Sequence, residues 1–266
     1  MTDAARPVSV AREGRVAVVT FDRGDGINAL SSDLMLALTE AALALSREDD
    51  LSAVVLHGAG GAFSLGFDLE EGRRRWETKP GIDERRRAAK IGRDLCRAWA
   101  GLEPMTFCAV EGWCVGGGAA LAAHCDLRVA GRSARFYLPE VERGLNLSWG
   151  AVPRLAALVG PARAKRLAAL AERLDAPTAE AWGLVDRIAE DGGALGAARD
   201  WAETAAGLPP LALRMCKAQA EAAGHAFDRA VSFLDADQFV LSSLTEDHAE
   251  SLAAFFEKRP PRYEGR

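Results

Sequence analysis

Short apolar runs that end in glycine-bearing loops, each followed by a helical pattern, constrain the fold of this chain more than any other feature. Residues 15–21 form a β-branched run, and over residues 31–45 apolar side chains recur at helical spacing behind a Ser-Ser-Asp start. Residues 53–57 and 106–110 form two further runs that lead into glycines. The alternation continues over residues 126–130, 151–158 and 162–170. This pattern predicts an α/β fold with parallel strands.

The strand patterns stop near residue 200, which suggests two regions. The remaining chain carries three helical patterns, over residues 209–223, 226–241 and 246–256. We therefore expect a core over residues 1–200 that holds the functional site, and a helical region over residues 201–266. No internal repeat or low-complexity linker separates them.

Composition excludes several classes of protein. The chain has 266 residues, of which 49% are hydrophobic, and its formal net charge is −5. This charge disfavours a dedicated nucleic-acid binder, which needs a basic surface. No stretch reaches the roughly 20 apolar residues of a membrane span, and the first residues lack a signal pattern. Five cysteines without a CxxC pair suit a reducing compartment, so we expect a cytoplasmic protein that binds neither nucleic acid nor membrane.

Motifs of several enzyme classes are missing. The four histidines show no HxH or HExxH spacing, so we expect no metal. The chain also lacks a GxSxG nucleophile elbow, a GxxxxGK[ST] phosphate loop and a GxGxxG motif that opens a helix. The sequence therefore contains none of these motifs for a hydrolase, an NTPase or a dinucleotide-binding protein.

Two glycine-bearing loops carry the chemistry instead. One spans residues 62–69 and contains Gly66, and the other spans residues 112–120 and contains three consecutive glycines from Gly116. Glycine lets the backbone approach a ligand closely, and the residues after each loop have a helical pattern. The first amides of a helix are unpaired, and two such amides aimed at one oxygen form an oxyanion hole that stabilises a thioester enolate. The alternative is that both loops are ordinary turns.

Together the motifs resemble the crotonase (enoyl-CoA hydratase/isomerase) superfamily. They are, in chain order, Asn28-Ala29-Leu30, residues 62–69, residues 112–126 and Pro139-Glu140, and the resemblance extends from about residue 16 to residue 259. It implies a spiral of ββα repeats and C-terminal helices that assemble a homotrimer or a hexamer. It also implies an acyl-CoA thioester as substrate, without a separate cofactor because coenzyme A is part of that substrate.

The resemblance also assigns roles to individual positions. The oxyanion donors would be the backbone amides of Phe67 and Gly117. Asp68 would support its loop rather than perform chemistry. Contacts to coenzyme A would come from Arg23, Ala62, Gly66 and Lys258. The clusters Arg73-Arg74-Arg75 and Arg85-Arg86-Arg87 alternate with acidic residues, which indicates a solvated helical face. Binding of coenzyme A phosphates or of RNA is the alternative for these clusters.

The carboxylates of the pattern decide the reaction. Hydratases of the family carry one Glu three residues beyond the oxyanion glycine and another after the proline, and here these positions are Ala120 and Glu140. Hydration needs water activation and proton delivery, whereas an allylic proton shift needs a single base. Glu140 alone therefore favours a Δ3,Δ2-enoyl-CoA isomerase.

Alternatives remain open within and outside the family. A 2-enoyl-CoA hydratase or a related acyl-CoA lyase is the nearest. The hydroxycinnamoyl-CoA hydratase-lyases use one Glu, but the tyrosine that they supply has no match over residues 226–241. The acidic residue of dienoyl-CoA isomerases is Ser148 here. A non-catalytic CoA- or RNA-binding protein is the alternative of a different class. Trp149 is either a wall of an acyl pocket or a core residue.

Overall fold

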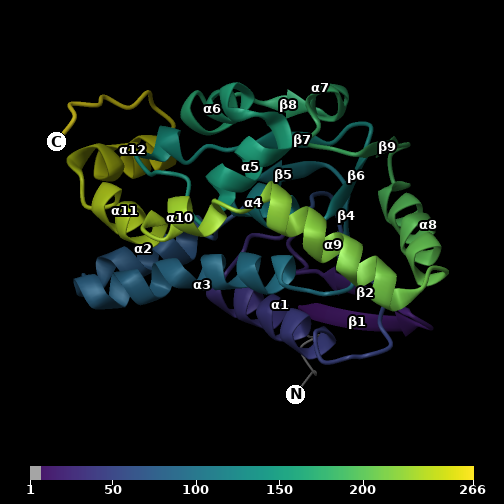
Figure 1. Ribbon diagram of the computed structural model, residues 1–266. Helices are drawn as coiled ribbons and strands as arrows, with labels where there is room; N and C mark the ends of the chain where they lie inside the picture. The colour runs from purple at the N-terminus through teal and green to yellow at the C-terminus, as the bar shows by residue number, and fades with distance from the viewer. Residues whose placement is uncertain (1–6) are drawn as a thin grey trace, which may run out of the picture.

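The computed structural model describes residues 7–266 of the chain (Figure 1). Its larger sheet has six strands in the order β1-β2-β3-β4-β6-β9, in which β1 is antiparallel to β2 and the other neighbours are parallel. These strands are β1 (Val8–Glu13), β2 (Val16–Phe21), β3 (Ala53–Gly58), β4 (Met105–Val110), β6 (Leu127–Gly131) and β9 (Arg187–Ala189). The predicted α/β organisation with parallel strands is therefore confirmed.

Strand β1 was not predicted from the sequence. It pairs with β2 along its whole length, from Val8 opposite Phe21 to Glu13 opposite Val16. Apart from Val8, its side chains are exposed, because β1 lies at the edge of the sheet. An edge strand with one solvated face needs no continuous apolar run, and the pattern that reveals the inner strands is missing here.

The inner strands are buried on both faces, as parallel sheets usually are. On β2, Val19 and Phe21 join the larger hydrophobic core, whereas Val16 and Val18 point to the opposite face. Helix α8 (Ala194–Ala206) covers that opposite face and contacts β3, β4 and β6 with its alanines. In Figure 1, α8 lies at the right of the sheet, and α9 ends beside it. Within residues 7–266, no helix is long and apolar enough to cross a membrane.

Most helices pack on the larger core. They are α1 (Ser32–Leu45), α3 (Ile82–Ala100), α4 (Gly117–Ala123), α5 (Ala151–Val159), α6 (Pro161–Ala169) and α7 (Ala176–Trp182). None of the described residues of α2 (Leu69–Glu77) belongs to that core. The predicted start of the first helix is confirmed, since the Ser31 side chain accepts a hydrogen bond from the Leu34 amide at 3.3 Å. The two helical patterns after residue 150 are confirmed as α5 and α6.

A second, smaller sheet lies next to α4, and one of its strands is joined to the first glycine-bearing loop. It consists of β5 (Trp113–Val115), β7 (Arg135–Tyr137) and β8 (Leu174–Asp175), with β5 parallel to β7 and β7 antiparallel to β8. Isolated bridges join Leu30 to Phe67 and Ser64 to Cys114. The two glycine-bearing loops are therefore tied to each other and to the loop after β2.

The C-terminal region is helical, as predicted, but one of its helices differs from the prediction. It contains α9 (Pro210–Gly224), α10 (Asp228–Ser232), α11 (Asp235–Ser242) and α12 (Glu246–Glu257). The single helix predicted over residues 226–241 was wrong, because the chain breaks between α10 and α11. At the end of α10 the Ser232 hydroxyl donates to the Asp228 carbonyl at 2.6 Å, and at the start of α11 the Asp235 carboxylate accepts the Gly150 amide at 2.6 Å.

Helices α10, α11 and α12 lie beside α2 and α3, whereas α9 runs towards α8 (Figure 1). Helix α11 contacts α3, α10 contacts α5, and α12 contacts the short 3₁₀ helix η1 (Val141–Arg143). The expected division after residue 200 falls inside α8, which packs on the main sheet. Residues of α11 and α12 line one side of the cavity described below.

Candidate active site

A cavity of about 730 Å³ lies between the glycine-bearing loops, α3 and the C-terminal helices. It brings together four residues that the sequence singled out: Gly66, Phe67, Gly117 and Glu140. Helices α11 and α12 contribute aromatic and aliphatic side chains, among them Phe239, Val240, Phe255 and Phe256. The sequence carried no signal for these four, because their contact with the loops is purely tertiary.

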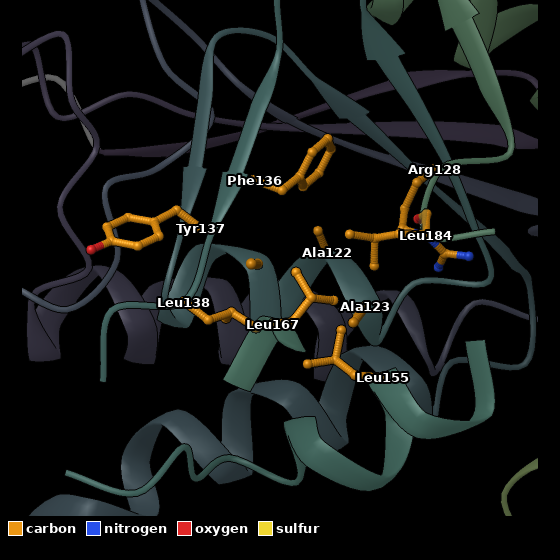
Figure 2. A pocket seen from close by; sticks show the side chains of 10 residues that line it. Ala122, Ala123, Arg128, Phe136, Tyr137, Leu138, Leu155, Leu167 and Leu184 are labelled. Carbon is orange, nitrogen blue, oxygen red and sulfur yellow. The ribbon is translucent and has the colours of Figure 1, made fainter. Parts of the chain in front are cut away.

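A second, much smaller hollow lies on the other side of α4 (Figure 2). Side chains of α4, β7, α5 and α6 point into it, as Ala122, Phe136, Leu155 and Leu167 show in Figure 2. Its volume of about 10 Å³ is barely that of one water molecule. It is a packing defect beside α4 and cannot hold a substrate.

The Phe67 amide faces away from the strand-like bridge that holds its loop. In the parallel bridge with Leu30, the Leu30 amide donates to the Gly66 carbonyl at 2.7 Å, and the Asp68 amide donates to the Leu30 carbonyl at 3.2 Å. The N–H of the residue between them therefore points to the opposite side. Gly66 has φ 84°, a left-handed conformation that favours glycine.

The Gly117 amide is the first of helix α4, so it has no partner within the helix. The preceding Gly116 makes the turn into α4 with φ 51° and ψ −118°, and its own amide donates to the Tyr137 carbonyl at 2.8 Å. Among residues 7–266, neither the Phe67 amide nor the Gly117 amide has a hydrogen-bond acceptor. Both residues line the cavity.

The two loops touch at Gly66. A Cβ atom at this position would lie 2.7 Å from the Val115 carbonyl oxygen and 3.2 Å from the Gly117 nitrogen, so only glycine fits. This close approach brings the two unpaired amides to neighbouring positions on one wall. Such a pair can bind a single carbonyl oxygen and stabilise the charge that develops on it.

Glu140 follows β7 and precedes η1, and its carboxyl group lies against the turn that starts α4. A Cβ atom on Gly116 would be 2.7 Å from Glu140 Oε1. Glu140 Oε2 is buried and has no hydrogen-bond partner among the described residues. Burial raises the pKa of Glu140 from 4.5 to about 7, despite opposing effects of its own backbone amide and of the Arg143 charge. A carboxyl group with this pKa can both accept and return a proton near neutral pH.

Two other described carboxylates line the cavity, and both are paired. Asp68 accepts the Glu71 amide at 3.0 Å and forms an ion pair with Arg23 at 2.8 Å, which fits its predicted supporting role. Burial opposes a lower pKa of Asp68, but these contacts outweigh it. Glu70 pairs with Arg73 at 3.0 Å. The carboxylate available for chemistry is therefore that of Glu140.

Ala120 lies in the first turn of α4 and lines the same cavity, with 1% of its surface exposed. Its amide donates to the Gly116 carbonyl at 2.9 Å, so its methyl group stands one turn above the start of the helix. Residue 120 is the position at which the sequence resemblance expects the first carboxylate of hydratases. Ser148, buried, and Trp149, partly buried, complete this part of the wall.

The residues predicted to contact coenzyme A are spread more widely. Gly66 lines the cavity, whereas Arg23, Ala62 and Lys258 lie outside the described lining. Arg23 donates to the Ala29 carbonyl at 2.7 Å in addition to its pair with Asp68. Ala62 is buried, and Lys258 is an exposed residue that ends α12 with φ 55°. Their proposed contacts with coenzyme A stay predictions.

The basic clusters are largely balanced by neighbouring acids. Arg73 pairs with Glu70 and Glu77 on α2, and Arg86 pairs with Asp237 of α11. Arg85 differs, since it lines the cavity and donates to the Pro80 carbonyl at 2.9 Å. Within residues 7–266, no group of three or more His, Cys, Asp or Glu residues could hold a metal ion.

Comparisons with known proteins place these features in a family. The family model described as Enoyl-CoA hydratase/isomerase matches residues 11–266. The chain is 33% identical to a short-chain-enoyl-CoA hydratase of Clostridium acetobutylicum, which covers 95% of each chain. It is 30% identical to a 1,2-epoxyphenylacetyl-CoA isomerase of Escherichia coli, over 96% of this chain and 97% of that protein.

Solved structures agree with the sequence comparisons. An enoyl-CoA hydratase/isomerase from Pseudoalteromonas atlantica superposes with a TM-score of 0.87 at 28% identity, over 97% of this chain and 100% of that one. An enoyl-CoA hydratase from Mycobacterium avium gives a TM-score of 0.85 at 27% identity, over 97% and 99% of the two chains. The crotonase-like fold implied by the sequence motifs is thereby confirmed.

Proposed function

The chain belongs to the enoyl-CoA hydratase/isomerase family, and we propose that it is a Δ3,Δ2-enoyl-CoA isomerase with Glu140 as its single acid-base group. The observation that carries this proposal is the set of carboxylates in the cavity. Asp68 and Glu70 are engaged with arginines, Ala120 can carry no proton, and Oε2 of Glu140 is buried without a hydrogen-bond partner among the described residues. A family enzyme with this site has one group to move one proton.

The reaction follows from the positions of these groups. The thioester oxygen of a 3-enoyl-CoA would accept hydrogen bonds from the Phe67 and Gly117 amides, which makes the C2 protons more acidic. Glu140 would remove a proton from C2, and the resulting dienolate would spread its charge between the oxygen, C2 and C4. Protonation of C4 by the same carboxyl group moves the double bond from C3–C4 to C2–C3. The proton returns to the substrate and the enzyme is restored.

Hydration of a 2-enoyl-CoA is the second candidate, because relatives at 31–33% identity carry hydratase names. Adding water requires a group that activates the water and a group that delivers a proton. In this cavity the methyl group of Ala120 stands where one of these carboxylates would be. Ser148 also lines the cavity, but a hydroxyl is a weak base at neutral pH.

A non-catalytic CoA- or RNA-binding protein is the remaining alternative. Membership of an enzyme family and the buried Glu140 Oε2, which has no hydrogen-bond partner among the described residues, argue against it.

We also propose that the protein assembles as a homotrimer or a dimer of trimers. Large apolar side chains of the C-terminal region are exposed in the single chain, notably Phe227 at 78%, Phe233 at 63% and Leu241 at 70%. Exposed large apolar side chains in such number support a protein interface in this region. The helices after residue 200 would form the contact.

The proposed reaction is tested with matched 2-enoyl and 3-enoyl thioesters of coenzyme A. We expect isomerisation of the 3-enoyl compound, and a loss of about 10²- to 10⁴-fold in the Glu140→Gln variant with little change in affinity. Glu180→Gln, an exposed change on α7, is the control and should keep full activity. Efficient hydration by the unmodified protein, with Ala120 in place, would overturn the single-base isomerase and establish the hydratase.

A further inference from the structure

The indole of Trp149 is held between two helices at positions where only glycine leaves room for it. A Cβ atom on Gly92 of α3 would lie 1.9 Å from Cε2 of the ring, and a Cβ atom on Gly117 of α4 would lie 2.4 Å from Cη2 and Cζ3. Both distances are far below van der Waals contact. The six-membered part of the ring therefore packs directly on the backbone of both glycines.

Both Gly92 and Trp149 have a backbone setting that is unfavourable for their residue type. Gly92 lies in the middle of a 19-residue helix, where glycine is a poor helix former, and its φ is not in the left-handed region. Glycine is needed at residue 92 because a larger residue would leave no space for the Trp149 ring. Trp149 itself has φ 62°, a conformation that side chains of this size rarely adopt. Strained residues of this kind concentrate at functional sites.

The ring also stands at a defined place in the cavity. It touches Gly117, whose amide is the proposed donor to the thioester oxygen, and it lines the cavity together with Gly92. Small side chains of α3, Ala88 and Ala89, continue this wall. The carbons that follow the thioester in an acyl chain would therefore run past the indole towards α3.

We propose that Trp149 determines the length of acyl chain that the site accepts, because its ring fills the space between Gly92 and Gly117 into which a longer chain would extend. The inference rests on the proposed function only in taking an acyl-CoA as ligand, and it does not depend on which reaction follows. A smaller side chain at residue 149 would leave that space to the substrate.

The test is the affinity of saturated acyl-CoAs of increasing chain length, measured by calorimetry on the wild type and on Trp149→Leu and Trp149→Phe. For the wild type we expect the affinity to rise by about fourfold per methylene and then to stop rising at a definite length. In Trp149→Leu the rise should continue for further methylenes, and Trp149→Phe should be intermediate. Trp201→Phe, which alters an indole packed on Phe107 of the main sheet, is the matched control with an unchanged profile.

The outcomes separate the possible roles of the ring. The same limiting chain length in Trp149→Leu and wild type would overturn the inference, and so would an equal loss at all lengths, which a merely structural role would give. Turnover of 3-enoyl thioesters in parallel tests the proposed reaction separately. A shifted length limit without isomerase activity would refute the reaction and leave the role of Trp149 intact.

A double-mutant cycle tests the contact without relying on one variant. Gly92→Ala places a methyl group where the Trp149 ring lies and would push the ring into the cavity. In the wild-type background it should therefore lower acyl-CoA affinity by about tenfold or more. In the Trp149→Leu background the same change should have little effect, since alanine is the better helix former and the ring is gone. An equal effect of Gly92→Ala in both backgrounds would contradict the contact.

Discussion

Replacing Glu140 by glutamine should stabilise the folded protein, and the gain should grow with pH. The carboxyl group is buried beside Gly116 with no partner for Oε2, and burial raises its pKa from 4.5 to about 7. A shift of this size corresponds to a cost of about 3 kcal/mol for keeping the charged form in the folded state. Glutamine has nearly the same shape and carries no charge at any pH.

The direction of the pH dependence follows from the two pKa values. Below pH 4.5 the carboxyl group is protonated in both states, and Glu140 imposes no cost. Between about pH 4.5 and pH 7 the unfolded chain releases its proton while the folded protein retains it, so the stability of the wild type falls as the pH rises. Above pH 7 the full cost is present. The advantage of Glu140→Gln should therefore increase by about 2 to 3 kcal/mol from pH 5 to pH 8.

The assay is urea unfolding of both proteins at pH 5, 6, 7 and 8, at one protomer concentration because assembly would contribute to stability. Glu180→Gln, at an exposed position of α7, is the control and should change the free energy of unfolding by less than about 0.5 kcal/mol. A difference between Glu140→Gln and wild type that stays flat from pH 5 to pH 8 would refute the reasoning. It would mean that water or a polar partner reaches the carboxyl group in the folded protein.

Other predictions concern turnover and assembly. Isomerase kcat/KM should fall about tenfold per pH unit below about pH 7, because the base must be ionised, and a profile flat down to pH 5 would exclude Glu140 as the base. Gly117→Pro removes one oxyanion donor and also presses on the Trp149 ring, so kcat should fall by at least about 10²-fold, and full turnover in a folded variant would contradict the donor role. Ala120→Glu supplies the carboxylate that hydratases carry, and hydration of a 2-enoyl-CoA should become measurable by absorbance. In light scattering, a trimeric or hexameric mass is expected, with dissociation in a Phe227→Glu variant; a monomeric wild type would remove the interface proposal.

Local patterns in the sequence were sufficient to predict the framework of the site. The inner strands have apolar runs because both their faces are buried, and the Ser31 cap marks the start of α1. Glycine is needed at residue 66 because a Cβ atom there would lie 2.7 Å from the Val115 carbonyl oxygen and 3.2 Å from the Gly117 nitrogen. Edge strand β1 escaped prediction because its exposed side chains need no apolar pattern.

Only the tertiary structure decided how this framework acts. Glu140 is an ordinary polar residue in the sequence, and its raised pKa depends on burial by segments distant along the chain. The Asp235 side chain, at the start of α11, accepts the amide of Gly150, 85 residues away. Trp149, Gly92 and Gly117 come from separate elements and meet only in the folded protein. Helical and strand patterns record which face of an element is buried, whereas burial of a charge or a ring depends on which elements meet, and that is set by long-range packing.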